Sequence, residues 1–425
     1  MALVFSGYVK AIDPLGTQYK IGDYLGALGL RDAVNDWLTL GASVGISALE
    51  FCLGIFLLFA IHRRVVSRIS VVFMAIMTII TLWLWVANPI SDCGCFGDAI
   101  ILTNGQTLLK NIVLLACAVV VAWKPLNMVR FISKTNQWIV INYTIVFVLL
   151  SSLWSLYALP VFDFRPYHIG ADIAKGMEIP EGEKGPEYVT TFILEKNGER
   201  REFTLDDYPD STWTFIDSRT EQVSEGYVPP IHDFSVERID DGEDITQQVL
   251  DKGYTFLLIS PWLEKASDTN FGEIDLLYEY AHEHGYPFYC LTSSNEQAIE
   301  RWRELTGAEY DFCFTDATTL KTIVRSNPGL LLLKDGTVIR KWSHNRLPSL
   351  DQEMMDKPLE RLEMGQMPND SVPQKLGILL MCFVLPLFLL TLADRLWAWT
   401  KWIRRSKPER AEAETETQKE EKEET

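Results

Sequence analysis

The chain has 425 residues, a formal net charge of -18 at pH 7 and seven cysteines. This length favours two or three domains over one compact domain. Much of the negative charge lies in the middle of the chain and in the C-terminal segment 400–425, which is basic and then acidic and is expected to be a disordered cytoplasmic tail. The charge therefore gives no indication of nucleic-acid binding.

Long apolar runs predict a membrane protein that contacts the lipid bilayer. Each of five runs is long enough, or nearly so, to cross about 30 Å of hydrocarbon; they are 38–61, 69–87, 107–123, 138–162 and 376–393. A sixth run, residues 1–9, is too short to cross. It has the pattern of the back half of a helix, so we expect the natural start to lie further upstream.

The distribution of basic residues predicts the orientation of these spans. Lysine and arginine gather in the short segments 62–68, 124–134 and 401–407, and such segments stay on the cytoplasmic side. The loop 91–100 and the whole segment 163–375 are then expected outside. Counting the first run, the chain has six predicted spans with both termini inside.

Two cysteines stand one glycine apart in the external loop, in the motif DCGCFGD. Because disulfides persist outside the cytoplasm, Cys93 and Cys95 are expected to be redox-active or bridged. A bridge between them closes a very small ring, which Gly94 permits, and a strained bridge accepts electrons readily. Asp92 and Asp98 flank the pair. Negative charge disfavours thiolates, so these carboxylates are expected to orient the loop or relay protons.

Other interpretations of the cysteine pair stay open: a purely structural bridge or tight turn, a metal site, or two unpaired buried thiols. A metal site is disfavoured because closed zinc sites need four ligands, and the loop has no second cysteine pair and no histidine. Cys52, Cys117 and Cys382 fall inside predicted spans, where cysteine is usually a small apolar filler.

Glu50 is an ionisable residue within the predicted span 38–61. Such a group faces the bundle interior and has a partner, and Lys10 is the partner we expect. Glu50 is either a proton relay or part of a quinone pocket, or a protonated side chain in an interhelical hydrogen bond. The loop after Lys10 is expected to cap the bundle beside the cysteines or to lie on the interface, and its polar residues are Asp13, Tyr19, Lys20, Asp23 and Tyr24.

Strand-like and helix-like stretches alternate through residues 229–365, which predicts an α/β domain. The segment SNPGLLLLKDGTVIRKW resembles the thioredoxin fold, in which a cis-proline precedes a strand and a hairpin, so Pro328 is expected to follow a cis bond. Thioredoxin-like oxidoreductases carry Cys-x-x-Cys after the first strand, whereas SPWLEKASDTNFGEID has no cysteine. The domain is therefore expected to bind or position a thiol protein. Cys290 and Cys313 are expected in its core, with a bridge between them as the alternative.

The opening FSGYVKAIDPLGTQYKIGDYL, together with DCGCFGD between two later spans, resembles the MauE/DoxX membrane proteins over about residues 1–160. The resemblance implies a small helical bundle in a bacterial inner membrane that supports disulfide formation or passes electrons towards quinone. In such a membrane, the orientation expected from the basic segments places the thioredoxin-like domain in the periplasm.

The fold class predicted is thus a membrane α-helical bundle plus an extracytoplasmic α/β thioredoxin-like domain. The expected parts are a MauE/DoxX-like domain (1–162), a small β-rich linker with an Asn-Gly hairpin (163–228), a thioredoxin-like domain (229–365), a last transmembrane helix (374–399) and the tail. The first hypothesis is a redox component, with an oxidoreductase activity left open, in which Cys93, Cys95 and Glu50 pass electrons from an external thiol protein to quinone, without metal. The alternatives are a non-catalytic scaffold whose thioredoxin-like domain binds a client, and a small-molecule or metal carrier.

Overall fold

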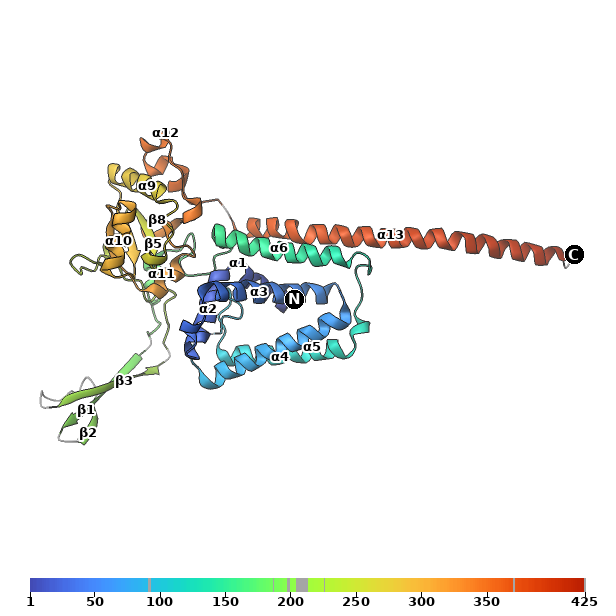
Figure 1. Ribbon diagram of the computed structural model, residues 1–425, viewed down its shortest axis with the longest axis horizontal. Coiled ribbons are helices and arrows are strands. Elements are labelled where there is room, and N and C mark those ends of the chain that lie inside the picture. Colours follow the sequence, from blue (N-terminus) through green and yellow to red (C-terminus); the bar gives the residue numbers. More distant parts are fainter. Residues whose placement is uncertain are drawn as a thin grey trace. The chain divides into compact units, whose positions relative to one another are not determined.

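The computed structural model describes residues 1–90, 93–185, 187–196, 199–203, 213–224, 226–369 and 371–423. The chain divides into two compact units. A helical unit comprises Met1–Arg165 with Pro368–Thr425, and a mixed unit comprises Pro166–Met367 (Figure 1).

The helical unit is a bundle of long helices. Among the described residues, five helices are long and apolar enough to cross a membrane, so the chain is a multi-pass membrane protein. The bundle consists of α1 (Ala2–Ile12), α2 (Pro14–Ala27), α3 (Asp36–Leu58), α4 (Arg63–Ala87), α5 (Asn104–Trp123), α6 (Gln137–Tyr157) and α13 (Val372–Glu423). The five are α3 to α6 and residues Val372–Lys401 of α13, and α1 is a shorter apolar helix.

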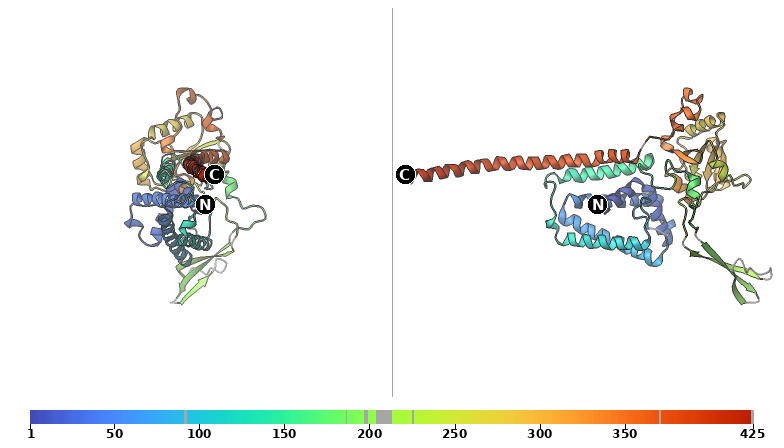
Figure 2. Two further views of the ribbon diagram at one scale, coloured as in Figure 1. Left: turned by 90° about the vertical axis from the view of Figure 1, so that its right-hand side faces the viewer. Right: turned by 180° about the vertical axis from the view of Figure 1, so that it is seen from behind.

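Two predictions for this unit are wrong. The segment after Lys10 is not a loop but helix α2. Asp13 is its N-cap, because the Asp13 side chain accepts a hydrogen bond from Gly16 N at 2.9 Å, and Pro14 occupies the first helical position. The tail also continues as helix α13 to Glu423 instead of being disordered, so α13 extends beyond the other helices of the bundle (Figure 2).

Helices α1 and α3 pack closely because glycines stand at their contact. A Cβ atom on Gly7 would lie 2.4 Å from the backbone nitrogen of Phe51, and one on Gly54 would lie 2.8 Å from the backbone nitrogen of Val4. Small residues allow membrane helices to approach in this way. The contact fixes α1 against the face of α3 that carries Glu50.

That face of α3 is polar although the helix is apolar overall. Ser43, Ser47 and Glu50 follow one another at helical spacing, and all three are buried. Ser43 Oγ donates to Pro14 O at 2.6 Å, and Ser47 Oγ donates to Ser43 O at 2.7 Å. The bundle therefore has a polar interior beside α1 and α2.

The basic segments lie at the far end of α4 from the cysteine loop. Arg63, at the start of α4, donates to Leu126 O at 2.7 Å. Asp394 of α13 accepts from Ser133 N at 2.8 Å and from Asn136 Nδ2 at 2.7 Å. The 25 residues of α4 span about 37 Å, so the basic end and the cysteine end are separated by roughly one membrane thickness.

The mixed unit is built on a six-stranded sheet in the order β4-β7-β6-β5-β8-β9. Strands β5, β6 and β7 are parallel, whereas β8 and β9 form an antiparallel hairpin beside β5. The strands are β4 (Glu237–Arg238), β5 (Tyr254–Ser260), β6 (Phe288–Thr292), β7 (Asp311–Phe314), β8 (Gly329–Lys334) and β9 (Thr337–Ser343). The Asn327–Pro328 bond before β8 is cis, as expected.

Helices connect the parallel strands, which confirms the predicted α/β class. Helix α9 (Phe271–Glu283) connects β5 to β6 and α10 (Glu296–Thr306) connects β6 to β7, whereas α11 (Ala317–Ile323) leads from β7 to the antiparallel strand β8. The short helices α7 (Ile173–Met177), α8 (Thr246–Leu250) and α12 (Gln352–Met355) lie elsewhere in the unit. Leu277 of α9 and Trp302 of α10 pack in one core with Phe256 and Leu258 of β5. The predicted fold class, a helical bundle plus an α/β sheet domain, is confirmed.

The buried cysteines of this sheet do not form a bridge. Cys290 of β6 pairs in register with Phe312 of β7, while Cys313 pairs with Leu291. Side chains alternate between the faces of a strand, so the two sulfurs point to opposite faces. Both are free thiols, and burial raises the pKa of each. The core-packing interpretation holds.

The predicted hairpin belongs to a separate three-stranded sheet, in the order β2-β1-β3. Its strands are β1 (Glu187–Lys196), β2 (Glu199–Phe203) and β3 (Thr214–Ser224). Strands β1 and β2 pair antiparallel as predicted, but the sequence did not predict a third strand on the other edge of β1. The expected Asn-Gly turn at 197–198 lies outside the described residues.

Candidate functional site

Cys93 and Cys95 form a disulfide across a tight turn. Their Cα atoms are 5.5 Å apart, which is within the usual range for a bridge. Gly94 has φ +59°, a conformation that side chains rarely adopt. A Cβ atom there would lie 3.0 Å from Cγ of Lys20, so the aliphatic stem of Lys20 packs against the turn.

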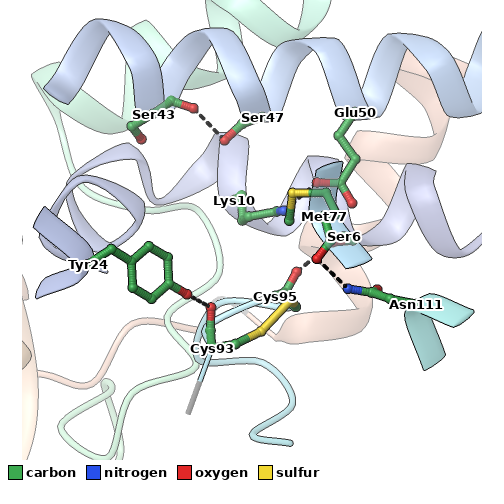
Figure 3. A network of polar contacts seen from close by, with 10 residues as sticks. All are labelled: Ser6, Lys10, Tyr24, Ser43, Ser47, Glu50, Met77, Cys93, Cys95 and Asn111. Carbon is green, nitrogen blue, oxygen red and sulfur yellow. Dashed lines mark hydrogen bonds and ion pairs between the residues drawn. A yellow bond between two sulfur atoms is a disulfide. The ribbon is translucent and has the colours of Figure 1, made fainter. Parts of the chain in front are cut away.

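The disulfide faces the interior of the helical bundle and is not exposed on the surface of the loop. Cys93 is 6% exposed and Cys95 is 8% exposed. Ser6 of α1 donates to Cys95 O at 2.6 Å, and the Tyr24 hydroxyl of α2 donates to Cys93 O (Figure 3). Both cysteines also pack against Leu84 of α4. Three helices thus hold the bridge in place.

An ion pair between Lys10 and Glu50 lies inside the bundle, one helical turn along α1 from Ser6 (Figure 3). Each residue is 5% exposed. A lone charge in a membrane bundle is costly, so such groups pair with one another. The pairing expected from the sequence is therefore present.

A small cavity joins the ion pair to the disulfide. Its volume of about 10 Å³ is room for about one water molecule. The polar residues that line it are Ser6, Lys10, Glu50, Lys110 and Asn111, together with Cys95. Two amines and one carboxylate therefore share this cavity with one cysteine of the bridge.

Lys110 of α5 is one of the site residues that the sequence interpretation missed, together with Ser6 and Asn111. Its Nζ lies 4.2 Å from the centroid of the Phe96 ring, a cation–π contact with the cysteine loop. The sequence shows Lys110 near the end of an apolar run, where lysine normally extends towards the headgroups. The inward turn of the loop brings Phe96 against this amine, and Cys95 lines the same cavity.

The site residues predicted from the sequence fall into two groups, those that the structure brings together and those that it does not. The structure brings Cys93, Gly94, Cys95, Lys10, Glu50, Lys20 and Tyr24 together. It gives Asp13 the capping role on α2, leaves Asp23 exposed, and places Tyr19 and Asp98 in half-buried positions. Asp92 lies outside the described residues. Pro328 belongs to the mixed unit.

The segment that follows β5 has no cysteine and carries the aromatic side chain of Trp262. Asn327 Nδ2 donates to Trp262 O at 2.8 Å, and Ser260 Oγ donates to Asn327 Oδ1 at 2.7 Å, which ties the end of β5 to the cis peptide. The amines of Lys265 and Lys321 lie 5.4 and 4.8 Å from the centroid of the Trp262 ring. These residues offer no thiol chemistry.

A large apolar groove of about 800 Å³ also belongs to the helical unit. Its lining comes from α1, α3, α6, α13 and neighbouring segments and is aliphatic and aromatic, with hydroxyls on Tyr8 and Thr391. Phe5 lines the groove, and its ring centroid lies 5.7 Å from that of Phe96 in the cysteine loop. The groove suits a long hydrophobic lipid chain.

Among the described residues, no group of three or more His, Cys, Asp or Glu side chains is placed to hold a metal ion.

Comparison with known proteins gives matches to two family models and to solved structures. Residues 188–225 match a domain of unknown function (DUF8463), and no curated protein matches the chain. A solution structure from Bacteroides thetaiotaomicron, named as a candidate protein disulfide isomerase, is 13% identical, covers 27% of this chain and 76% of its own, and has a TM-score of 0.22. Residues 1–124 match the family described as methylamine utilisation protein MauE. This match covers the part of the chain that carries the disulfide, Lys10, Glu50 and Lys110, and it names MauE and not DoxX.

Proposed function

We propose that the helical unit is a thiol–disulfide electron carrier of a bacterial inner membrane. The Cys93–Cys95 disulfide takes two electrons from a dithiol protein on the external side, and the resulting dithiol gives them to a membrane quinone. One observation carries the proposal: the disulfide lies inside the bundle, on a cavity that it shares with the buried Lys10–Glu50 pair.

The two half-reactions balance at the cysteines. Reduction breaks the S–S bond of the bridge while two partner thiols join in a disulfide, so two electrons and two protons arrive at Cys93 and Cys95. Oxidation re-forms the bridge and releases the same two electrons and two protons. The Lys10–Glu50 pair supports this step because it places a proton donor and a proton acceptor on the cavity that Cys95 lines.

The groove of about 800 Å³ supports quinone as the electron acceptor. A quinone, when bound, supplies the capacity to accept two electrons and two protons. The aliphatic and aromatic lining suits an isoprenoid tail, and the lining residues that carry side-chain hydroxyls are Tyr8 and Thr391. Helix α1 contributes Ser6 and Lys10 to the cavity and Phe5 and Tyr8 to the groove, so both sites share one helix.

The distribution of charge supports the orientation. Arg63, Lys124 and Arg130 stand in the segments at the basic end of the bundle, which we assign to the cytoplasm. The cysteine loop then faces the periplasm, and so does the mixed unit, which leaves and re-enters the bundle by α6 and α13.

The test uses full-length protein in proteoliposomes, reduced with dithiothreitol and then freed of it. We expect added decylubiquinone to re-form the Cys93–Cys95 bridge, measured as the loss of two alkylation mass shifts, while the quinone is reduced. The Cys93→Ser, Cys95→Ser double variant should fold and insert but reduce no quinone. A bridge that keeps one redox state whatever reductant or oxidant is supplied contradicts the proposal.

The mixed unit favours a second function, that of a scaffold which docks a client protein. Its observation is the Trp262 site beside the cis-proline, where the described residues carry lysines and an aromatic ring in place of thiols. The same double variant separates the two functions in cells. Full function at normal protein level favours the scaffold, and loss of function with intact protein favours electron transfer.

A further inference from the structure

We infer that the two cysteines have different roles: an incoming thiolate attacks Sγ of Cys93, and Cys95 is released as a thiolate beside the lysine-lined cavity. This inference rests on the proposed function and assigns a direction to its first step. It also makes Lys110 a positioning residue of the reaction.

The asymmetry of the site is visible in what each cysteine touches. Of these two cysteines, Cys95 alone lines the cavity that holds Lys10, Lys110 and Glu50. Its carbonyl accepts from Ser6, which lines the same cavity, whereas the Cys93 carbonyl accepts from Tyr24 of α2. Of the two residues of the bridge, Cys95 therefore lies on the side of the loop that faces the charged cavity.

The charges of the cavity favour an anion there. Two amines face one carboxylate, and Glu50 is already paired with Lys10. The amine of Lys110 is held over Phe96, the residue next to Cys95. Because a neighbouring lysine stabilises a thiolate, and does so more strongly where water is scarce, Cys95 is the better leaving group.

Solvent exposure does not determine which sulfur is attacked, because the exposed fractions of Cys93 and Cys95, 6% and 8%, are nearly equal. In thiol–disulfide exchange the rate then depends on which thiolate leaves more easily. Attack on Cys93 releases the stabilised Cys95 thiolate, whereas attack on Cys95 releases Cys93, which does not line the cavity.

The step conserves atoms and electrons. The partner thiolate forms a bond to Sγ of Cys93, the Cys93–Cys95 bond breaks, and its electron pair stays on Cys95. A second partner thiolate then attacks the partner sulfur in the mixed disulfide and releases Cys93 as a thiolate. The partner has lost two electrons, and the cysteine pair has gained them.

The test uses reduced glutathione as the probe on oxidised, full-length protein in detergent. The exchange is stopped with acid, free thiols are alkylated, and fragmentation mass spectrometry locates glutathione on the peptide that carries both cysteines. We expect at least roughly tenfold more glutathione on Cys93 than on Cys95. Lys110→Met should slow the exchange and reduce this ratio, and Lys110→Arg should restore both.

Lys124→Met is the matched control, since it removes the same charge from an exposed position at the other end of α5. It should leave the rate and the ratio unchanged. Glutathione found equally on both cysteines or mainly on Cys95, or a ratio that Lys110→Met does not change, overturns the inference and leaves the proposed electron transfer standing. A bridge that glutathione does not open contradicts both.

Discussion

At the scale of single residues, the buried Lys10–Glu50 pair is the feature of the site that the stability of the bundle explains least. Two charges lose free energy of hydration when they are buried, and their mutual attraction rarely does more than offset this loss. Apolar side chains of similar size can therefore replace a buried pair without loss of stability. The position of the pair, on a cavity shared with a disulfide, supports the proton-transfer role proposed above.

Substitution of the pair tests that role. Lys10→Met or Glu50→Leu alone leaves one buried charge without its partner and should lower the free energy of unfolding by about 3–5 kcal/mol. The double variant should unfold near the wild-type temperature in detergent but reduce decylubiquinone far more slowly. A double variant with wild-type turnover contradicts the proton-transfer role.

The sequence predicted some of these residues and not others, for physical reasons. Glu50 and Lys10 stand out because a charge within an apolar run needs a partner. Lys110 does not, because a lysine near the end of a span ordinarily extends to the interface. Asp13 was assigned to the site because it lies near Lys10, yet its position before Pro14 is that of a helix cap.

At the scale of helices, the α1–α3 contact determines where the site residues of α1 lie. Gly7→Ala would place a Cβ atom 2.4 Å from the backbone of Phe51, so the helices must separate. We expect this change to lower the free energy of unfolding by about 1–3 kcal/mol. It should also slow quinone reduction, because Ser6 and Lys10 move with α1.

Gly41→Ala on α3 is the control for this prediction. Gly41 is exposed, and no atom lies within 4 Å of a Cβ placed there. Since alanine favours a helix over glycine by about 1 kcal/mol, this variant should be as stable as the wild type or more so. Thermal unfolding in detergent compares the two, and equal losses for both variants would show that the close contact does not matter.

The helices that hydropathy predicts well are those whose whole length is apolar. Helix α2 was expected as a loop because Asp13, Pro14 and several glycines interrupt its sequence. Its helix depends on the Asp13 cap and on packing against α3, whose Ser43 donates to Pro14 O. Strand β3 was missed because its partner, β1, lies more than ten residues away in the sequence.

At the scale of the whole molecule, one chain joins a membrane unit that carries a disulfide to an α/β unit in which Cys290 and Cys313 are buried free thiols. The sequence predicted both units from apolar runs and alternating strands. It did not predict that the cysteine loop turns inward, because that depends on Ser6 and Tyr24, which lie 89 and 69 residues from the carbonyls they bind. Hydropathy treats each span separately and contains no information on such contacts.

The most direct measurement is alkylation of Cys93 and Cys95 in intact cells with a thiol reagent that cannot cross the inner membrane. After brief treatment with dithiothreitol, we expect two labels on the peptide that contains both cysteines, without lysis. After treatment with an oxidant we expect none. Thiols that become labelled only after lysis, or a bridge whose state does not follow the treatment, would contradict an external, redox-active disulfide.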